Sequence, residues 1–375
     1  MVFHHSSLLI LVVVLFGCAK SRKVETTQPH NQLKYATGFA IDQLGSVKKI
    51  EVTTPYHNAA TSFTYFLAPE GAIVPDSLQG DIIRTPVKRM VCTSTSHIPL
   101  LDYLDETETL VGFPTTDYIS SPAMRAHIES GAVVDLGVDK SMNVELITTL
   151  QPDMIMAYSV TGNMGQLKKL KELGNKVVIN AEYLEPHPLG RAEWIKFMAC
   201  FFEKETMADS IFNAIEANYQ KTKSLVGENT QPTVMSGIVY GDTWFMPAGQ
   251  NYAAKLLGDA GYRYLWSDNS STGFLELSFE SVFIRAQAAD YWIGVGSFET
   301  LDQMKTADPR YAGFKAFQQG RVYTYNARIG PKGGSEFLEL GYLRPDIILK
   351  DLVKIAHPGL LPGYTPYFHK KLKIR

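Results

Sequence analysis

Residues 143–157 read NVELITTLQPDMIMA, and this stretch decides the fold class. Asn143 is a residue type favoured before a helix, and the residues up to position 150 predict a short helix. Residues 153–157 then form an apolar run of the kind that is buried in a parallel sheet. A helix followed at once by a buried strand indicates an α/β fold.

A second stretch repeats this order of features. Residues 278–293 read SFESVFIRAQAADYWI. In the first stretch Glu145 opens the helix and Asp153 enters the strand eight residues later. In the second stretch Glu280 and Asp290 have the same roles at a distance of ten residues. The correspondence predicts two similar lobes.

The regions around these stretches agree with that organisation. Short apolar runs alternate with helical patterns from residue 86 onward, which predicts a mostly parallel sheet in each lobe. Residues 189–225 carry apolar side chains at spacings of three and four, typical of helices, with Glu-Lys-Glu at 203–205 dividing a shorter helix from a longer one. Residues 33–85 are rich in aromatic and β-branched residues between turn residues, and we expect their strands to add to the edge of the following sheet.

Composition excludes several classes of protein. The chain has 375 residues, long enough for about two domains. Its 36 basic and 38 acidic residues leave a formal net charge of −2, which argues against a basic surface for nucleic acid. Three cysteines are too few for a disulfide scaffold or a four-thiolate zinc site.

The N-terminus reads MVFHHSSLLILVVVLFGC. The apolar run at residues 8–16 is too short to cross a membrane and has the form of a secretory signal. Its end, Leu15-Phe16-Gly17-Cys18, resembles the bacterial lipoprotein box, in which the signal is cut before a cysteine that carries lipid. An ordinary signal with a chance cysteine is the alternative. The polar stretch up to residue 32 is expected to be a tether.

Two further cysteines lie inside the predicted lobes. Cys92 falls in an apolar strand and Cys200 in a helical run. Both are expected to be buried free thiols, and one disulfide formed in the oxidising envelope is the alternative.

These patterns divide the chain into seven parts. They are a signal peptide at 1–17, a lipidated tether at 18–32, a β-rich extension at 33–85, lobe 1 at 86–187, a bridging helical segment at 188–228, lobe 2 with a C-terminal helix at 229–357, and a tail at 358–375.

The first stretch, preceded by Asp135-Leu136-Gly137, resembles the "NLExIxxLxPDLVI" signature of the periplasmic-binding proteins of iron-chelate and cobalamin ABC importers. Residues 89–93 resemble the family's first strand, and Ala260-Gly261 with Ser278-Phe279-Glu280 resembles its second-lobe pattern. The resemblance covers about residues 86–355. It implies two Rossmann-like α/β lobes bridged by a long helix, with the ligand in the cleft between them.

The resemblance also implies a function. The protein would be a lipid-anchored monomer in the periplasm or cell envelope, with no intrinsic cofactor and no catalytic residues. It would capture a metal chelate, namely a ferric siderophore, haem or cobalamin, and deliver it to an ABC permease dimer with its ATPase. Glutamates that match Glu145 and Glu280 contact arginines of the permease in this family. The alternative is that both only stabilise the helix dipole in a first turn.

Cleft residues are expected in loops that follow strands. The candidates are Thr93, Ser96, His97 and Tyr118 in lobe 1 and Tyr240, Trp244, Trp266, Phe274 and Arg328 in lobe 2. Aromatic rings could cover flat apolar ligand faces, and the guanidinium could pair with an anionic ligand. The alternatives are core packing for the aromatic residues, helix capping for the hydroxyls after the first strand, and a solvated loop for the arginine.

Two other functions have weaker support. A site for bare zinc or manganese would need ligands such as His97, His127 and His187, which show no paired spacing. An envelope enzyme would be expected to show a nucleophile elbow, a phosphate-binding loop or a dinucleotide fingerprint, and none is present in the sequence. A binding protein is therefore the preferred interpretation.

Overall fold

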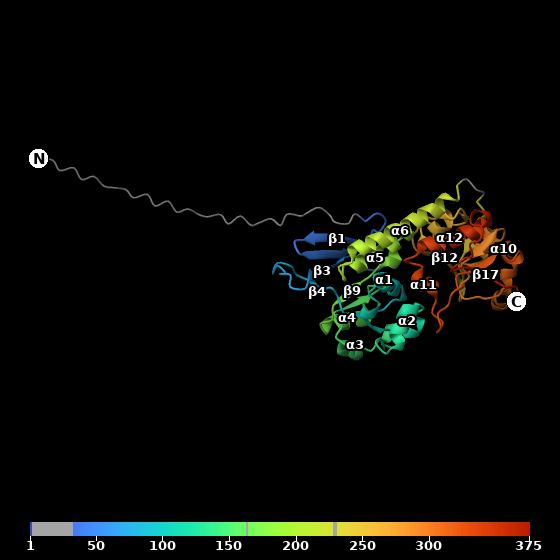
Figure 1. Ribbon diagram of the computed structural model, residues 1–375. Coiled ribbons are helices and arrows are strands. Elements are labelled where there is room, and N and C mark those ends of the chain that lie inside the picture. The colour runs from blue at the N-terminus through green and yellow to red at the C-terminus, as the bar shows by residue number, and fades with distance from the viewer. Residues whose placement is uncertain (2–32, 163, 228–230) are drawn as a thin grey trace.

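The structure is a computed structural model that describes residue 1 and residues 33–162, 164–227 and 231–375. Two α/β lobes lie at opposite ends of a pair of helices, and a small N-terminal sheet lies beside the first lobe (Figure 1). The two-lobe α/β fold expected from the sequence is confirmed. Apart from residue 1, the predicted signal peptide and the predicted tether, including Cys18, lie outside the described residues.

Lobe 1 is built on a parallel sheet with strand order β7-β6-β5-β8-β9. After β5 the chain adds β6 and β7 at one edge of β5, and it then adds β8 and β9 at the other edge. This change of direction leaves a crevice at the carboxyl ends of the two strands. The elements are β5 (Met90–Cys92), α1 (Ile98–Tyr103), β6 (Leu110–Phe113), α2 (Pro122–Glu129), β7 (Val134–Asp135), α3 (Val144–Leu150), β8 (Met154–Ala157), α4 (Gly165–Glu172) and β9 (Val177–Ile179).

Lobe 2 has a sheet of order β13-β10-β15-β16-β17, parallel except for β17. Because β17 pairs with β16, the C-terminal tail is part of this sheet. Its elements are β10 (Thr233–Ser236), α7 (Tyr252–Asp259), β13 (Arg263–Tyr264), α8 (Phe279–Ala286), β15 (Tyr291–Ile293), α9 (Leu301–Ala307), α10 (Lys315–Gln318), β16 (Val322–Thr324), α11 (Glu336–Leu340), α12 (Pro345–Ala356) and β17 (Lys370–Lys371).

A second, antiparallel sheet of lobe 2 was not expected from the sequence. It consists of β11 (Ile238–Tyr240), β12 (Thr243–Pro247) and β14 (Phe274–Leu277). Along β12 the side chains alternate between the core and the outer face, so that Trp244 is buried and Phe245 is partly exposed.

The two aspartates of the repeated stretches have the same structural role. Asp153 accepts the backbone N–H groups of Lys88 and Arg89 at 2.8 and 2.9 Å, just before β5 begins. Asp290 accepts the backbone N–H and the hydroxyl of Thr233, where β10 begins. Although burial opposes it, hydrogen bonds from Lys315 and Thr233 lower the pKa of Asp290 to about 2. Each carboxylate therefore ties a strand start to the neighbouring parallel strand.

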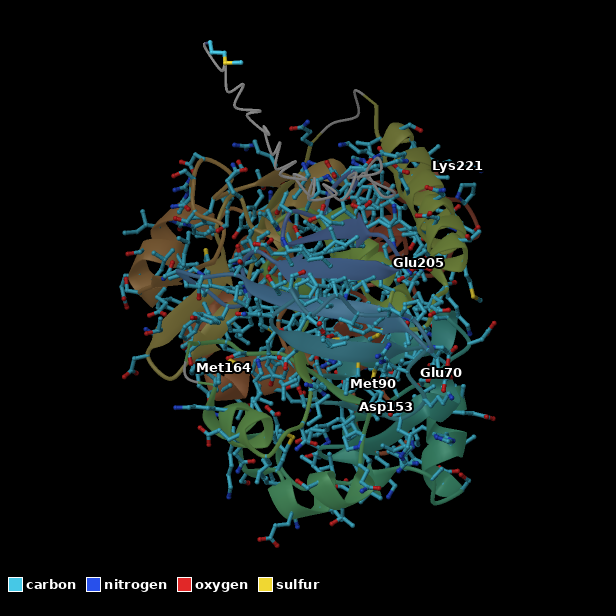
Figure 2. The ribbon with its side chains drawn as sticks, turned by 90° about the vertical axis from the view of Figure 1, so that its left-hand side faces the viewer. Glu70, Met90, Asp153, Met164, Glu205 and Lys221 are labelled. Atoms are coloured by element: carbon cyan, nitrogen blue, oxygen red, sulfur yellow. The ribbon has the colours of Figure 1, made fainter. Side chains whose placement is uncertain are left out.

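The N-terminal extension forms a sheet of its own, in the order β1 (Phe39–Leu44), β2 (Val47–Val52), β3 (Phe63–Pro69) and β4 (Asp81–Thr85). This corrects the expectation that its strands extend the sheet of lobe 1. Figure 2 looks onto this sheet, with Met90 and Asp153 of lobe 1 below it. Phe39 packs on the ring of Trp194 at 4.7 Å, and the backbone N–H of Ile179 donates to the Tyr65 hydroxyl. The sheet therefore joins lobe 1 and the bridging segment through side chains.

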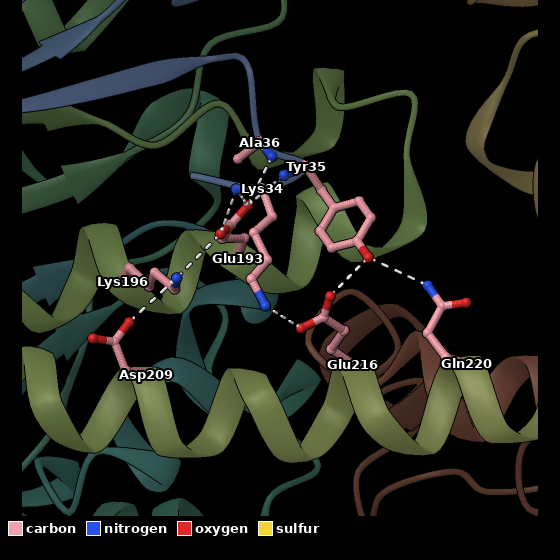
Figure 3. Close-up of polar contacts among 8 residues, drawn as sticks. All are labelled: Lys34, Tyr35, Ala36, Glu193, Lys196, Asp209, Glu216 and Gln220. Atoms are coloured by element: carbon pink, nitrogen blue, oxygen red, sulfur yellow. Dashed lines mark hydrogen bonds and ion pairs between the residues drawn. The ribbon is translucent and has the colours of Figure 1, made fainter. Parts of the chain in front are cut away.

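The bridging segment consists of α5 (Pro188–Ala199) and α6 (Glu205–Ser224), which matches the predicted break at residues 203–205. All twelve residues of α5 are buried. Within α5, the Glu193 carboxylate accepts the backbone N–H groups of Lys34, Tyr35 and Ala36 (Figure 3). Glu216 of α6 binds the Lys34 ammonium and the Tyr35 hydroxyl. Residues 34–36 are thus held by both bridging helices.

Two further sequence expectations concern cysteines and membrane spans. Cys92 and Cys200 are buried free thiols, so they do not form the alternative disulfide. Burial raises the pKa of the Cys200 thiol to about 12, which keeps it protonated and unreactive. Among the helices of the described residues, none combines the length and the apolar character needed to cross a bilayer.

Candidate ligand-binding cavity

A cavity of about 380 Å³ lies where lobe 2 meets α5 and the end of lobe 1. That volume is within the range of small-molecule sites. One wall is the outer face of the antiparallel sheet, with Ile238, Phe245 and Phe274. Another part of the lining comes from the segment after β16, with Phe337, Leu338 and Tyr342 among its residues. The cavity is therefore lined mainly by apolar and aromatic side chains.

A single guanidinium enters this apolar cavity. Arg191, on α5, is 8% exposed and lines the cavity. Its Nε and Nη2 donate to the backbone carbonyls of Glu185 and Tyr183, at 3.1 and 2.7 Å. Its Cζ lies 3.7 Å from the centroid of the Tyr252 ring and 4.5 Å from that of Tyr342. The two carbonyls and the two rings fix the direction of the side chain.

The cavity wall after β16 also reaches lobe 1. Glu339 of α11 is 2% exposed and accepts the backbone N–H groups of Ser120 and Ser121, which precede α2. Arg344 donates from Nη1 to the Tyr103 hydroxyl at 2.8 Å. Burial raises the pKa of the Glu339 carboxyl to about 7, although the two N–H groups favour its charged form. The lobes thus contact one another through a buried carboxyl group.

Three of the predicted lobe 1 residues, Thr93, Ser96 and His97, follow β5 and are buried. Ser96 donates to the Glu182 carboxyl, and both ring nitrogens of His97 are buried. Burial lowers the pKa of His97 to about 3 and raises that of Glu182, so both groups favour their neutral forms. This polar cluster lies under α11 and does not line the cavity.

The predicted aromatic residues of lobe 2 separate into two groups. Phe274 lines the cavity and is 69% exposed. Tyr240 lies at the β11–β12 turn, 82% exposed and away from the cavity lining. Trp244 is fully buried, stacks on Trp292 at 5.3 Å and lies in the core of lobe 2, because its side of β12 faces inward. Trp266 is also buried and outside the lining.

Tyr118 and Arg328 likewise lie away from the cavity lining. Tyr118 is 59% exposed, and its backbone contacts the loop of lobe 2 at Gly334. Arg328 is exposed, with its guanidinium 4.0 Å from the ring centroid of Tyr367.

Sequence reasoning missed Arg191 and Tyr252, and it favoured core packing for Phe245, which lies next to Trp244. Arg191 carries a weak sequence signal, because it is one of three charged residues, with Glu193 and Lys196, in a mostly apolar helix. Tyr252 carries no such signal, since an aromatic residue in a helix is more often part of the core.

The two glutamates expected at the permease interface are exposed and lie on different lobes. Glu145 is in the first turn of α3 and Glu280 in the first turn of α8. Glu280 lies 3.3 Å from Arg310, which also pairs with Asp308. Glu145 forms no ion pair with any described residue. Both side chains are therefore accessible.

Within residues 33–162, 164–227 and 231–375, no group of three histidine, cysteine, aspartate or glutamate side chains is arranged to hold a metal ion.

Comparison with known proteins connects this geometry to a family. A model of the periplasmic binding protein family matches residues 90–329. An uncharacterized lipoprotein of Methanocaldococcus jannaschii is 26% identical over 98% of this chain and 95% of its own length. A second uncharacterized lipoprotein of that organism is 28% identical, over 96% and 95%.

Solved structures show the same fold. A periplasmic heme binding protein from Pseudomonas aeruginosa has a TM-score of 0.59 at 17% identity, covering 77% of this chain and 99% of that one. The apo form of a periplasmic heme-binding protein from Roseiflexus sp. RS-1 has a TM-score of 0.57 at 19% identity, covering 73% and 99%. At these identities the likeness concerns the fold.

Proposed function

The chain belongs to the periplasmic binding protein family, and on this basis we propose that it is the substrate-binding lipoprotein of an ABC importer for a metal chelate. It binds the chelate in the cavity beside α5 and delivers it to a permease dimer with its ATPase, without chemistry of its own. The observation that carries this proposal is the cavity itself, which combines apolar and aromatic walls with one buried guanidinium.

The lining supports a chelate with an extended organic surface. Phe245, Phe274 and Leu338 present partly exposed apolar groups around the cavity, where a flat or bulky ligand can cover them. Haem and ferric siderophores have such surfaces, and cobalamin is a third member of this class. Proteins of similar fold that bind heme make haem the first ligand to test.

The test is a titration of the purified soluble protein with haem, ferric siderophores, cobalamin and bare Zn²⁺. Calorimetry is the main readout, because all four tryptophans are buried away from the cavity lining. Saturable binding of at least one chelate is expected, with no turnover to a product. Binding of Zn²⁺ alone would replace the proposal by bare-ion transport, and product release without retained ligand would indicate an enzyme.

The anchor is proposed from Cys18, and the lipoprotein names of the relatives support it. Changing Cys18 to Ser is expected to move the protein from the membrane fraction to the soluble envelope fraction. Mass spectrometry of the wild-type N-terminus provides the direct control. A wild-type protein without an acyl chain would refute the anchor and leave the ligand proposal intact.

A further inference from the structure

Arg191 is a buried cation whose guanidinium contacts no carboxylate of the described residues. In the part of the chain that the structure describes, no carboxylate forms an ion pair with it. The two acidic residues nearest to it on this segment face the N-terminal strand instead. Glu185 accepts the backbone N–H groups of Thr37 and Gly38, and Glu193 accepts those of residues 34–36. Glu182 is a further buried carboxyl group that interacts electrostatically with Arg191 without an ion-pair contact, and burial raises its pKa, which favours its neutral form. The direct contacts of the guanidinium are therefore carbonyl groups and ring faces.

Such an arrangement is costly for the empty protein. Taking a charge out of water is unfavourable unless an opposite charge compensates it. Nη1 of Arg191 makes no hydrogen bond within the described residues, so it remains able to donate toward the cavity that the side chain lines. A group of this kind indicates a site for a partner that arrives from outside.

A second polar group lies at the same place. Tyr252 is 8% exposed, lines the cavity, and its hydroxyl has no hydrogen-bond partner among the described residues. Burial raises the pKa of this hydroxyl, so it stays protonated and can donate a hydrogen bond. Its ring lies against the Arg191 guanidinium. Nη1 of the cation and the neutral Tyr252 hydroxyl are thus available side by side, and neither has a hydrogen-bond partner among the described residues.

We propose that Arg191 and Tyr252 form an anion subsite that selects ligands bearing a carboxylate or similar anionic group on an apolar body. The inference rests on the proposed chelate-binding function and specifies the chemistry of the ligand. The exposed fractions of the lining side chains differ along the cavity. Arg191 lies at the buried end, whereas Phe274 and Leu338 are 69% and 49% exposed. The anionic group therefore enters first, and the apolar body covers the aromatic wall toward solvent.

Paired probes that differ in charge test this subsite. The first pair is haem, with free propionates, and haem dimethyl ester. The second pair is an anionic ferric catecholate and a neutral ferric hydroxamate. Wild type is expected to bind the anionic member of at least one pair about tenfold to a hundredfold more tightly, and Arg191→Gln is expected to remove that preference. Tyr252→Phe, which keeps the ring, should reduce it about threefold to tenfold.

Arg321→Gln is the matched control, because this exposed arginine also lies over a tyrosine ring, that of Tyr291, but outside the cavity. It should keep the wild-type preference for the anionic member of the pair.

If Arg191→Gln does not fold, the result for Tyr252→Phe alone decides. Three results would overturn the subsite. They are equal affinity within both pairs, no binding of either anionic member, and a preference for the anionic member that persists in Arg191→Gln and Tyr252→Phe. Equal and tight binding within a pair would still leave the chelate function standing. Metal-free protoporphyrin that binds as tightly as haem, with the same dependence on Arg191, would retain the subsite and refute chelate selectivity.

Discussion

The carboxylate of Glu339 in lobe 2 lies 2.6 Å from the backbone nitrogen of Ser120 in lobe 1. The neighbouring N–H of Ser121 donates to the other oxygen at 2.8 Å. The loops beside this contact are also closely packed, since a Cβ atom at Gly334 would lie 2.0 Å from the carbonyl oxygen of Tyr118. The segment of lobe 2 that forms part of the cavity wall is therefore held against lobe 1 by two hydrogen bonds and by close packing at Gly334.

Glu339 predicts a pH dependence of stability. Because burial raises its pKa to about 7, the folded protein binds this proton more tightly than the unfolded chain does. The resulting stabilisation is complete below the unfolded pKa of about 4.3 and is lost as the pH rises through about 7. Between pH about 5.5 and about 8, wild type should lose about 2 kcal/mol more of its unfolding free energy than Glu339→Ala loses.

Chemical denaturation of both proteins across this range measures the difference. The comparison with Glu339→Ala matters because other buried groups titrate too. Burial lowers the pKa of His97 to about 3 and that of His187 to about 4, so their contributions have the opposite sign. These contributions are common to both proteins. Parallel pH profiles would show that Glu339 does not titrate in this range.

Phe274 predicts a loss of affinity without a loss of stability. Its side chain lines the cavity but is 69% exposed, so Phe274→Ala removes contact with the ligand and little from the core. Haem affinity should fall by about 1–2 kcal/mol, with the melting temperature nearly unchanged. Tyr240→Ala on the same small sheet is the control, since Tyr240 is outside the cavity lining. Equal effects of the two substitutions would contradict the position of the cavity.

The positions of these aromatic residues show where sequence reasoning stops. The two lobes and the broken bridging segment could be predicted, because periodic apolar patterns fix helices and buried strands locally. Trp244 and Phe245 are adjacent on β12, so one must face the core and the other the outside. Which one faces the cavity depends on the pairing of β12 with β14, and no local pattern encodes that register. The same holds for Glu339 and Ser120, which are 219 residues apart in sequence.

Trp244 gives the converse prediction to Phe274. It is fully buried, stacks on Trp292, and donates from Nε1 to the Ser236 carbonyl. Trp244→Phe should cost about 1–3 kcal/mol of unfolding free energy, because it leaves a cavity and an unpaired carbonyl. Haem affinity of the folded fraction should stay within about twofold, since Trp244 does not line the site. A large loss of haem affinity at unchanged stability would contradict this prediction and show that Trp244 is part of the binding site.

Glu145 and Glu280 lead to the prediction about the permease. Each is exposed in the first turn of a helix on its own lobe, so together they can meet a two-fold symmetric partner that presents a basic patch to each lobe. Stabilisation of the helix dipole is the competing explanation, and it is worth about 0.3–1 kcal/mol per residue. Asp302 offers a comparison because it is also an exposed acidic residue in a first turn, that of α9.

The double variant Glu145→Lys, Glu280→Lys should bind chelate normally and fail to bind its permease or support uptake. A single exposed ion pair contributes only about 0–1 kcal/mol, whereas like charges facing each other at an interface cost several kcal/mol. Arg310 keeps Asp308 as a partner, so reversal at Glu280 does not leave it without a carboxylate.

Asp302→Lys is the control: it makes the same charge change at a helix start and should leave permease binding intact. The helix-dipole explanation instead predicts lower melting temperatures for all of these variants and normal permease binding by the folded protein. Melting temperature, chelate affinity and permease binding measured on one preparation separate the two, and normal binding by the folded double variant would refute the interface.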